Sequence, residues 1–502
     1  MSKPRMRMTM RDGHLVPIDI RAPQVRNQYE GASRGRRMNT KGASLTGPNT
    51  AIAHSLPLLQ SRSHNAIRNN AYAQGAMETY VANLVGTGIK PRWRNEQIQQ
   101  LWDRWMMECD ADEHDSFYGL QALAAGAQFE AGEVLGRFRY RRTSDGLSVP
   151  LQLQVIESDH LDPNYTHLAA GYPGRLVKMG IEFNAIGQRT AYHLWRYHPA
   201  EAISLEINQR VAVPASDIVH MFRRTRPGQL RGVPALTSVL VSLYDIDEMQ
   251  DATLQKQKLA QLFGAFVKRK ADADPEEEGP FFGTHVTAPE ERGEGISEFE
   301  PGGIHYLDDG EEVTFSNPAD VGGNYTGYLR TELLRFAKGA GLTYEQLTGD
   351  LSGVNYSSIR AGLLEFRRRA EALQAHLIVH RWCRPIAAKW LDVAVTSGAL
   401  SIPDYWANRS SLLAIDWIAP KWEWVDPLKE VTADKMEVRA GFAPRSEKAA
   451  ARGWDIEELD RETDAGNKSA DRFGLIYDSD PRRAAGNGTV QDASKVADIN
   501  EE

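Results

Sequence analysis

Apolar residues recur with helical spacing in the first part of the chain. From about residue 60, apolar positions between Ile67 and Val85 follow one face of a predicted helix that ends near Gly86. Two more stretches, 95–110 and 116–134, have the same character. Three helices are therefore predicted before residue 135.

Alternating apolar and polar positions then replace the helical spacing. The segments "LQLQVIES" (151–158), "TAYHLWRYH" (190–198) and "DIVHMFRR" (217–224) are typical of half-buried β-strands. Residues 50–230 are thus predicted to form an α+β region. His220, inside the third strand, is interpreted as a satisfied, half-buried residue and not as a catalytic base.

Helical spacing returns in two long segments that flank a region of different composition. Residues 235–267 predict one helix of about 50 Å, since an α-helix rises about 1.5 Å per residue. Such a helix outruns a single compact core, so part of it is expected to pack against other copies or to line something. A second helix is predicted over 325–341.

The last third of the chain is predicted to be mainly helical. Apolar positions from Ile359 to Leu377 form a narrow seam on a helix that is expected to end before Pro385. Trp422 and Trp424 are placed on one face of a strand, and a helix follows from Pro427. From about residue 464 the composition predicts a disordered polar tail.

Composition and charge restrict the class of protein. The chain has 502 residues, a net charge of −8 and two cysteines, Cys109 and Cys383, so it is not a disulfide scaffold and a reducing compartment is expected. Residues 1–41 carry ten Lys/Arg and three Asp/Glu, which is typical of a disordered arm or of an arm that touches nucleic acid or an acidic partner. No secretory signal or transmembrane helix is predicted, and no membrane partner is expected.

The region between the two long helices is strongly acidic. Residues 268–312 contain 14 Asp/Glu and 4 Lys/Arg in a stretch rich in Gly and Pro. Because these acids follow no fixed period, a solvated acidic surface is favoured over a metal-dependent nuclease site. No P-loop, zinc motif or dinucleotide fingerprint is present in the sequence, so no metal or other cofactor is predicted.

A glycine-rich polar loop, "LTGDLSGVNYSSIRAG" (347–362), separates two predicted helices. Its serines have no G-x-S-x-G context, and no histidine lies near Asp350 in the sequence. Two alternatives stay open beside a structural role. One is a hydrolase or nuclease that uses this Ser/Asp-rich loop, and the other is an oligomeric scaffold that does not pass DNA.

Several motifs resemble those of the lambda-type bacteriophage portal proteins. They are "YEGASRGRRM" (29–38), "SRSHNAIRNNAYAQGAMETYVANLVGTGIKPR" (61–92), "DIVHMFRRTRPGQLRGVPALTSVL" (217–240), "LTYEQLTGDLSGVNYSSIRAGLLEFRRR" (342–369) and "WVDPLKEVTADKMEVRAGF" (424–442). The resemblance implies an α+β portal fold, with wing, stem, clip and crown, in which long helices line the central channel of a ring. It implies a structural protein and not an enzyme.

The family's plan implies a boundary for each part of this chain. The expected parts are a basic N-terminal arm (1–50), a wing (51–235 and 358–425), two stem helices (236–267 and 321–345), a clip (268–320), a tunnel loop (346–357), a crown (426–463) and a disordered tail (464–502).

The resemblance also implies partners and a place in the particle. The expected partners are further copies of the chain, usually in a dodecamer, double-stranded DNA in the channel, the terminase large subunit, head–tail adaptor proteins and the major capsid protein. The expected location is a capsid vertex of the virion, after assembly in the host cytoplasm. Genome packaging and ejection would both pass through the ring.

Candidate site residues follow from the implied tunnel loop and clip. In the loop and the start of the next helix, the residues expected to face DNA are Gly349, Asp350, Ser352, Gly353, Asn355, Tyr356, Ser357 and Arg360. The clip residues expected to meet the terminase or adaptors are Glu276, Glu277, Glu278, Glu290, Glu291 and Glu294. Arg360 could reach a DNA phosphate or pair with an acid, and pairing is preferred.

Overall fold

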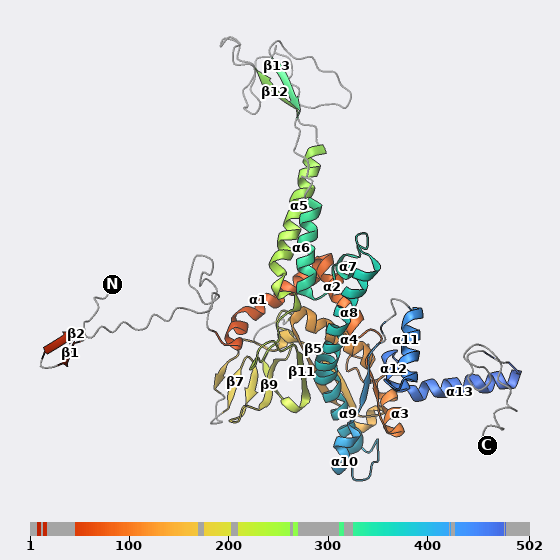
Figure 1. The fold of residues 1–502 in the computed structure, drawn as a ribbon. Helices are drawn as coiled ribbons and strands as arrows, with labels where there is room; N and C mark the ends of the chain where they lie inside the picture. The colour runs from red at the N-terminus through yellow and green to blue at the C-terminus, as the bar shows by residue number, and fades with distance from the viewer. Residues whose placement is uncertain are drawn as a thin grey trace, which may run out of the picture.

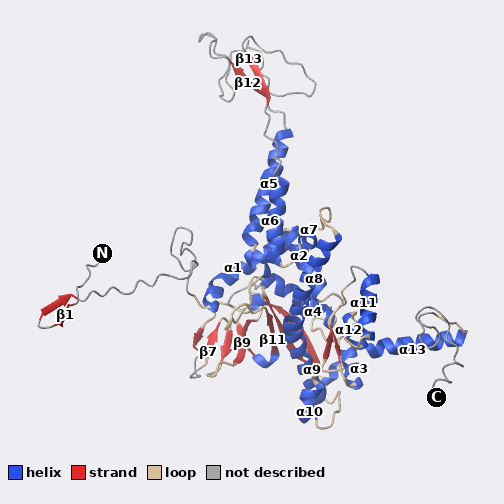
Figure 2. Cartoon of the chain, viewed as in Figure 1, coloured by secondary structure: helices blue, strands red, loops and turns tan. Residues whose placement is uncertain are grey.

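The computed structural model combines helices and antiparallel sheets, which confirms the predicted α+β class. It describes residues 8–11, 14–17, 46–168, 175–201, 209–261, 265–269, 311–315, 325–420, 422, 427–475 and 477. Figure 1 shows a body of helices and sheets from which one helix pair projects. Figure 2 shows strands in the body, beyond the end of that pair and near the N-terminus. No helix in the described ranges is both long and apolar enough to cross a membrane.

The first predicted helix is in fact two helices. Helix α1 spans Pro48–Asn69 and α2 spans Ala71–Leu84. Asn70 is extended between them, and its side chain accepts a hydrogen bond from the Ala73 amide at 3.0 Å, so it caps α2. The predicted start near residue 60 was therefore too late, because Pro48 at the first turn already begins the helix.

Two antiparallel sheets form the β-part of the body, and the predicted strands 151–158, 190–198 and 217–224 are confirmed as members of them. One sheet has the order β11-β4-β5, with bounds Ile218–Phe222, Glu133–Tyr140 and Leu151–Glu157. The other has the order β10-β9-β8-β7-β6, with bounds Arg210–Pro214, Arg189–Trp195, Ile181–Phe183, Leu176–Lys178 and His167–Leu168. Short 3₁₀ turns, η2, η3 and η4, lie at Thr143–Asp145, Ser158–His160 and Ala215–Asp217.

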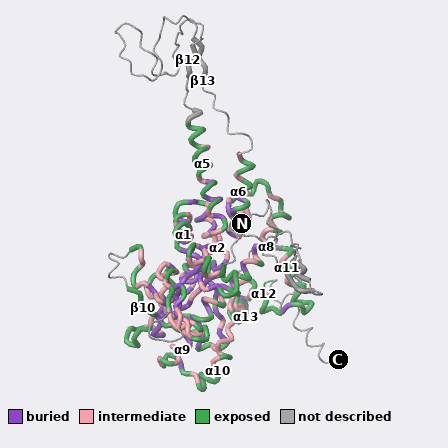
Figure 3. The backbone as a smooth tube through the Cα atoms, turned by 90° about the vertical axis from the view of Figure 1, so that its left-hand side faces the viewer, coloured by how far each residue is buried: buried purple, intermediate pink, exposed green. Residues whose placement is uncertain are grey.

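Aromatic side chains fill the centre of the body. Helices α3 (Glu96–Trp105) and α4 (Phe117–Ala131) bring Trp102 and Phe117 together with ring centroids 5.0 Å apart. Trp390, far along the chain, packs edge-on against Trp102 at 4.9 Å. In Figure 3 the buried residues concentrate in this body, and the projecting helix is exposed towards its tip. The core therefore joins the N-terminal and C-terminal halves of the chain.

The projecting pair consists of α5 (Leu240–Gln261) and α6 (Tyr325–Ala340). The predicted single helix over 235–267 was wrong at both ends: a 3₁₀ turn, η5 (Ala235–Ser238), precedes α5, and a strand follows it. That strand, β12 (Ala265–Arg269), pairs antiparallel with β13 (Glu311–Phe315). The apolar run that ends the predicted helix suits a strand equally well, because short apolar runs do not separate the two structures.

The seam helix continues past its predicted end. Helix α8 (Tyr356–Leu373) passes into a π-helical segment, η6 (Gln374–Cys383), and then into α9 (Arg384–Thr396). The Arg384 amide bonds the Val379 carbonyl, five residues back. Pro385 consequently falls in the first turn of α9, where its missing N–H is tolerated, so it does not end the helix.

The C-terminal part contains α10 (Tyr405–Leu412), α11 (Pro427–Arg439), α12 (Arg445–Ala451) and α13 (Ile456–Phe473). Strand β14 (Asp416–Ile418) pairs with β3 (Lys90–Arg92). Trp422 packs against Phe366 at a centroid distance of 6.3 Å, as expected for a core aromatic, whereas Trp424 lies outside the described residues. The prediction that the tail begins at 464 was wrong, because α13 runs through Phe473.

The N-terminal arm contains one described structure that the sequence did not predict. Strands β1 (Met8–Arg11) and β2 (His14–Pro17) pair as an antiparallel hairpin. This part of the arm therefore contains regular secondary structure.

Candidate functional site

The polar loop after α6 is held by short-range caps at each end. Helix α7 (Tyr344–Thr348) begins with a capping box between Thr343 and Gln346 and ends at Gly349, whose φ of 70° is left-handed. At the other end, the Asn355 side chain accepts a hydrogen bond from the Ser358 amide at 2.9 Å and caps α8. The irregular backbone is therefore 349–355, narrower than the predicted loop of 346–357.

Asp350 organises the interior of this loop. Its carboxylate accepts hydrogen bonds from the Ser352 hydroxyl at 2.6 Å and from the Ser352 amide at 2.9 Å. These bonds, the hydroxyl first, lower the pKa of Asp350 below its usual value. The side chain is thus an ionised acceptor that serves its own loop.

Arg330 of α6 lies beneath the loop and was missed by the sequence analysis. Its guanidinium is 3.7 Å from the Asp350 carboxylate and 4.5 Å from the centroid of the Tyr344 ring. A Cβ on Gly353 would have the Arg330 guanidinium as its nearest neighbour, at 3.7 Å. Helical periodicity places Arg330 on α6 but gives no signal that it would meet a loop twenty residues later.

The predicted loop residues fall on one continuous stretch of backbone. Ser352, Gly353 and Ser357 are exposed, and Tyr356 is the first residue of α8. Arg360, in the second turn of that helix, is half-buried and has no ion-pair partner among the described residues, so the preferred pairing with an acid finds no support. The clip residues Glu276, Glu277, Glu278, Glu290, Glu291 and Glu294 all lie outside the described residues.

The loop lacks the arrangement that hydrolysis by a serine nucleophile requires. Ser352 donates its hydroxyl proton to Asp350, and within the described residues no serine of this loop is hydrogen-bonded to a histidine. Elsewhere in the described residues, Glu157, Asp159 and His198 bring three possible ligand atoms within 4.8 Å. The His198 Nδ1 accepts the Ala200 amide, so its Nε2 carries the proton and faces Glu157 at 3.3 Å. Because a neutral His198 donates to Glu157, this contact is a hydrogen bond and not an ion pair.

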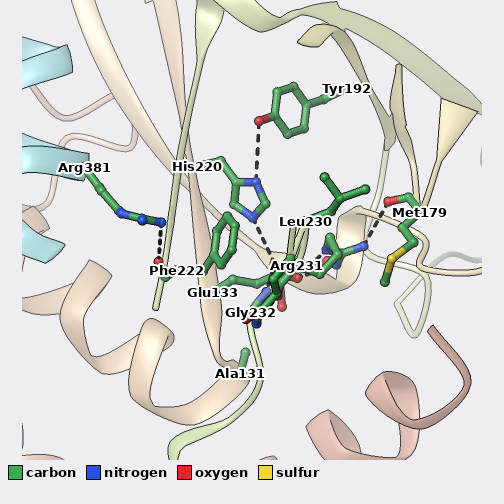
Figure 4. A network of polar contacts seen from close by, with 12 residues as sticks. Ala131, Glu133, Met179, Tyr192, His220, Phe222, Leu230, Arg231, Gly232 and Arg381 are labelled. Carbon is green, nitrogen blue, oxygen red and sulfur yellow. Dashed lines mark hydrogen bonds and ion pairs between the residues drawn. The ribbon is translucent and has the colours of Figure 1, made fainter. Parts of the chain in front are cut away.

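A buried network holds the second loop at the base of the helix pair, the one that precedes α5. Figure 4 shows its centre, where Glu133 of β4 meets Arg231 and Gly232 of the loop and His220 of β11. The Glu133 carboxylate accepts from Arg231 Nε at 2.6 Å, from the Gly232 amide at 2.7 Å and from His220 Nε2 at 2.9 Å. Both the Glu133 and Arg231 side chains are fully buried.

The contacts around Glu133 determine the charge states of the groups in this network. Burial alone would raise the pKa of Glu133, but the Arg231 charge and the His220 hydrogen bond lower it to about 2. Burial lowers the pKa of His220, although the bond to Glu133 opposes this shift. Neutral His220 therefore donates to Glu133 and can accept from the Tyr192 hydroxyl, 3.5 Å from its Nδ1. This confirms that His220 is a satisfied residue, and it is more buried than expected.

Remaining contacts of this loop reach distant parts of the chain. The Arg231 guanidinium also donates to the Met179 carbonyl at 3.2 Å, and the Asn49 side chain bonds both the Gly228 carbonyl and the Leu230 amide. Gly132 and Gly232 touch through their backbones: a Cβ on Gly232 would lie 2.1 Å from the Gly132 carbonyl oxygen. The loop thus joins α1, both sheets and the base of α5.

Comparison with known proteins assigns the chain to a family. The model of the phage portal proteins of the lambda family matches residues 34–374, which include both loops and the projecting helix pair. This chain belongs to the lambda family of phage portal proteins. A probable portal protein of Halomonas phage phiHAP-1 is 27% identical over 403 residues, covering 76% of this chain and 74% of that protein. Portal protein B of Escherichia phage lambda is 21% identical, covering 80% and 81%.

Among solved structures, a chain from the neck of a native gene transfer agent particle is 15% identical, with a TM-score of 0.42; it covers 84% of this chain and 99% of that one. Membership in the portal family gives the chain a structural role, and neither alternative function is supported. The motif 217–240, through which the sequence resembles portal proteins, has a structural explanation. Its residues His220, Arg231 and Gly232 donate hydrogen bonds to the buried Glu133 carboxylate.

Proposed function

We propose that this portal chain assembles into a twelve-membered ring at one vertex of the capsid and forms the channel through which double-stranded DNA is packaged and ejected. The observation that carries the proposal is the position of the exposed loop 349–355, which only the short helix α7 separates from a projecting helix pair whose base is fixed in the core. The ring would be part of the virion and would assemble in the host cytoplasm. No catalytic step is proposed for it.

The loop 349–355 is proposed as the tunnel loop that lies nearest to the DNA. A DNA duplex that slides past the loop needs small polar side chains that make no base-specific contacts, and Ser352, Gly353 and Asn355 provide them. Cationic side chains would hold the phosphates and slow sliding. Arg330, the arginine beneath the loop, is paired with Asp350 and stacked on Tyr344, so part of its charge is compensated within the chain.

Docking partners are proposed for the two ends of the ring. The acidic region 268–320, which lies between α5 and α6 in the sequence, would meet the terminase large subunit during packaging and head–tail adaptor proteins afterwards. Contacts with the major capsid protein would come from the body, the proposed wing. Acidic channel walls would repel DNA and keep it from adhering.

Native mass spectrometry of the purified chain, with negative-stain images of the same sample, tests the proposal. A closed ring of twelve copies with a central hole as wide as a DNA duplex is the expected result. A ring with no open channel would favour the scaffold that does not pass DNA. A monomer or dimer in every buffer, including samples with scaffold or capsid protein, would contradict the proposal.

The role of the loop can be tested separately in assembled rings. Replacing Ser352 and Gly353 by lysine should slow DNA passage and make retention of DNA strongly salt-dependent, because each added phosphate contact steepens the dependence on salt. Lysine at the exposed position Asp103 in the body supplies a control with the same change in charge, because replacing one aspartate by lysine adds as much charge as the two loop lysines together. The body control should pass DNA at the wild-type rate. If the loop variant also passes DNA at the wild-type rate and with the wild-type salt dependence, loop 349–355 does not face the channel.

A further inference from the structure

Two neighbouring segments of the body are strongly basic, although the whole chain carries a net charge of −8. Residues 218–244, from β11 into the first turn of α5, contain four arginines and no Asp or Glu. Residues 366–391, from α8 through η6 into α9, contain six Lys/Arg and a single acid, Glu371. The π-helical segment η6 packs against β11, so the two segments meet in the folded chain. Positive charge is therefore concentrated in this part of the body.

Arg381 of η6 is the centre of a first group of arginines. Its guanidinium donates to the Phe222 carbonyl at 2.8 Å, at the end of β11 (Figure 4), and lies 5.4 Å from the centroid of the Phe222 ring. The Arg189 guanidinium is 5.9 Å from the same centroid, and the side chain of Arg224 is exposed. Burial lowers the pKa of Arg381, and the positive charges of Arg224 and Arg189 lower it further. These three arginines are thus close enough to repel one another.

Arg369 of α8 forms a second group with Arg223. The Arg369 guanidinium lies against the backbone just beyond the end of α6, because a Cβ added to Gly341 would overlap it. Burial lowers the pKa of Arg369, and the positive charge of Arg223 lowers it further. Arg223 and Arg224 are consecutive in the chain, so the two groups are neighbours. Together they form one basic surface at the end of β11.

No acid within the described residues neutralises this surface. None of its five arginines forms an ion pair with a described Asp or Glu, and no acid contributes to the lowered pKa of Arg381 or of Arg369. Arg231, further along the same segment, is instead paired with Glu133 and fully buried. A partly buried cation without a counter-charge is costly. An anion from another molecule would remove that cost.

The composition of this surface suits the backbone of a nucleic acid better than a protein. The centres of protein interfaces are usually apolar and often aromatic. No large apolar side chain is among the exposed ones in 212–240 or 365–405, two ranges that the structure describes throughout. A guanidinium can donate two parallel hydrogen bonds to one phosphate. Several neighbouring guanidinium groups can therefore meet the closely spaced phosphates of a duplex.

We propose that Arg189, Arg223, Arg224, Arg369 and Arg381 form a binding site for the sugar–phosphate backbone of double-stranded DNA. The site reads no sequence, because its donors are directed at phosphate and not at base edges. It opposes free sliding, so it adds a surface that retains DNA to a loop that lets DNA pass. The inference rests on the proposed function, which brings DNA to the chain, and adds the part of the body that holds it.

Chemical protection of arginine locates the site in the full chain. The purified protein is treated with phenylglyoxal, which modifies arginine side chains, with and without a short DNA duplex, and the modified peptides are quantified by mass spectrometry. Arg223 and Arg224 should react about tenfold more slowly when DNA is bound, because phosphate contacts cover them. Arg94 and Arg104, which are exposed before and on α3, should react equally in both samples.

Two further samples replace the duplex by another anion. Polyglutamate at the same charge concentration should protect Arg223 and Arg224 much less than DNA does. Protection by polyglutamate and not by DNA would assign the surface to an acidic protein and overturn the proposal. Inorganic phosphate at the same phosphate concentration should also protect them less. Equal protection by inorganic phosphate would mean that the site binds a single phosphate and not a backbone, which overturns the proposal as well.

Binding measurements on variants give the energetic test. One variant carries Arg224→Gln and Arg381→Gln, and the control, Arg94→Gln with Arg104→Gln, removes the same charge. Fluorescence anisotropy of a labelled duplex is measured over a salt series. The slope of log K against log salt should fall by about 2 in the site variant, since each lost phosphate contact removes about 0.9. Equal binding by the site variant and the control would overturn the proposal.

Two additional variants exclude a folding defect as the cause. Arg224→Gln alone changes an exposed side chain and leaves the bond between Arg381 and the Phe222 carbonyl intact. It should lower the slope by about 1. Arg224→Lys with Arg381→Lys keeps both charges and should keep most of the slope. If the lysine variant binds DNA as weakly as the glutamine variant while both retain the wild-type urea midpoint, charge does not hold the DNA and the proposal fails.

The oligomeric state of the same samples separates this inference from the proposed function. Rings with an open channel, in which the site variant binds DNA as the wild type does, would overturn the binding site and leave the proposed function intact. DNA binding that depends on these arginines, in a chain that never closes a ring, would support the binding site and contradict the proposed function.

Discussion

Two glycine-containing loops stand at the base of the same helix pair, and they are built in opposite ways. The loop before α5, residues 225–234, has a fully buried arginine whose partner Glu133 is 98 residues away in the sequence. The loop after α6, residues 349–355, is exposed, and its internal hydrogen bonds span two or three residues. The first loop can form only when the body is folded, whereas the second closes on itself.

Because one loop is held by long-range contacts and the other by local ones, the two loops have different mechanical roles. Because the first loop ties α1, both sheets and the root of α5 together, displacing it would expose a buried charge pair. The second loop can change conformation without disturbing a core contact, apart from the pair that Asp350 makes with Arg330 at 3.7 Å. A fixed base and an adjustable loop suit a helix pair that must hold its position while DNA moves through the proposed channel. Substitutions in the two loops should therefore have unequal effects.

The largest effect is expected for Glu133→Gln. The amide leaves the Arg231 charge buried without a counter-charge, which costs about 3 to 5 kcal/mol of unfolding free energy. Urea unfolding followed by tryptophan fluorescence measures the loss. The double variant Glu133→Leu with Arg231→Met should lose much less than the sum of its single variants, because it removes both charges together.

The same carboxylate makes stability depend on acid in a defined window. The pKa of Glu133 is lowered to about 2 in the folded chain from an ordinary value of 4.5. Its contribution is therefore present above pH 4.5 and is lost as the pH falls from 4.5 towards 2. Wild type and Glu133→Gln should converge in stability at the bottom of this window. A constant difference down to pH 2 would contradict the assigned pairing.

A slightly smaller effect is expected for Gly232→Ala. The new Cβ would lie 2.1 Å from the Gly132 carbonyl oxygen, and because this is a backbone atom it cannot move aside as a flexible side chain would, so the cost should be about 3 kcal/mol. Gly353→Ala is the matched control in the exposed loop, where the nearest atom would be 3.7 Å away. It should change the unfolding free energy by less than about 1 kcal/mol. Equal losses in the two variants would remove the distinction between the loops.

The sequence allowed the exposed loop to be predicted far better than the buried one. Gly349 is a helix C-cap and Asn355 is a helix N-cap, so the end of α7 and the start of α8 follow from capping rules. His220, Arg231 and Gly232 stood in a motif that resembled a family, yet nothing in their spacing points to Glu133. Pairing across 98 residues is decided by tertiary packing, which no periodicity records.

Errors in the fold have the same origin. The extended Asn70 and the π-helical turn at η6 interrupt patterns that are helical on both sides, and the helical period alone continues through them. The seam positions Phe366, Ala370 and Leu377 are buried as expected, so the face was right although the helix changes type. The end of α5 was misplaced because the short apolar run that opens β12, residues 265–267, suits either a helix or a strand.

A moderate, pH-dependent effect is expected for His64→Gln in α1, the helix that the first loop holds through Asn49. Hydrogen bonds to Asp159 and then Glu130 raise the pKa of His64 from 6.5 to about 10. A raised folded-state pKa stabilises the fold fully below pH 6.5, and this contribution disappears as the pH rises through 10. After allowance for partial exposure, wild type should exceed His64→Gln by about 1 kcal/mol at pH 6 and match it near pH 10. His54→Gln, at an exposed position on the same helix, is the control; a similar pH-dependent loss there would refute the assignment.

The smallest effect on global stability is expected for Asp350→Asn, although it alters the centre of the exposed loop. An exposed amide loses the charge that accepts the Ser352 hydroxyl and amide, but no buried group is left without a partner, so the urea midpoint should not move. The change should instead appear locally, as faster hydrogen exchange of the Ser352 amide, since that bond protects it. Exchange in the first loop, at Gly232, should stay unchanged and serves as the internal control. A fall of the urea midpoint comparable to that of Glu133→Gln would mean that the second loop also fixes the core, and the contrast between a fixed base and an adjustable loop would be lost.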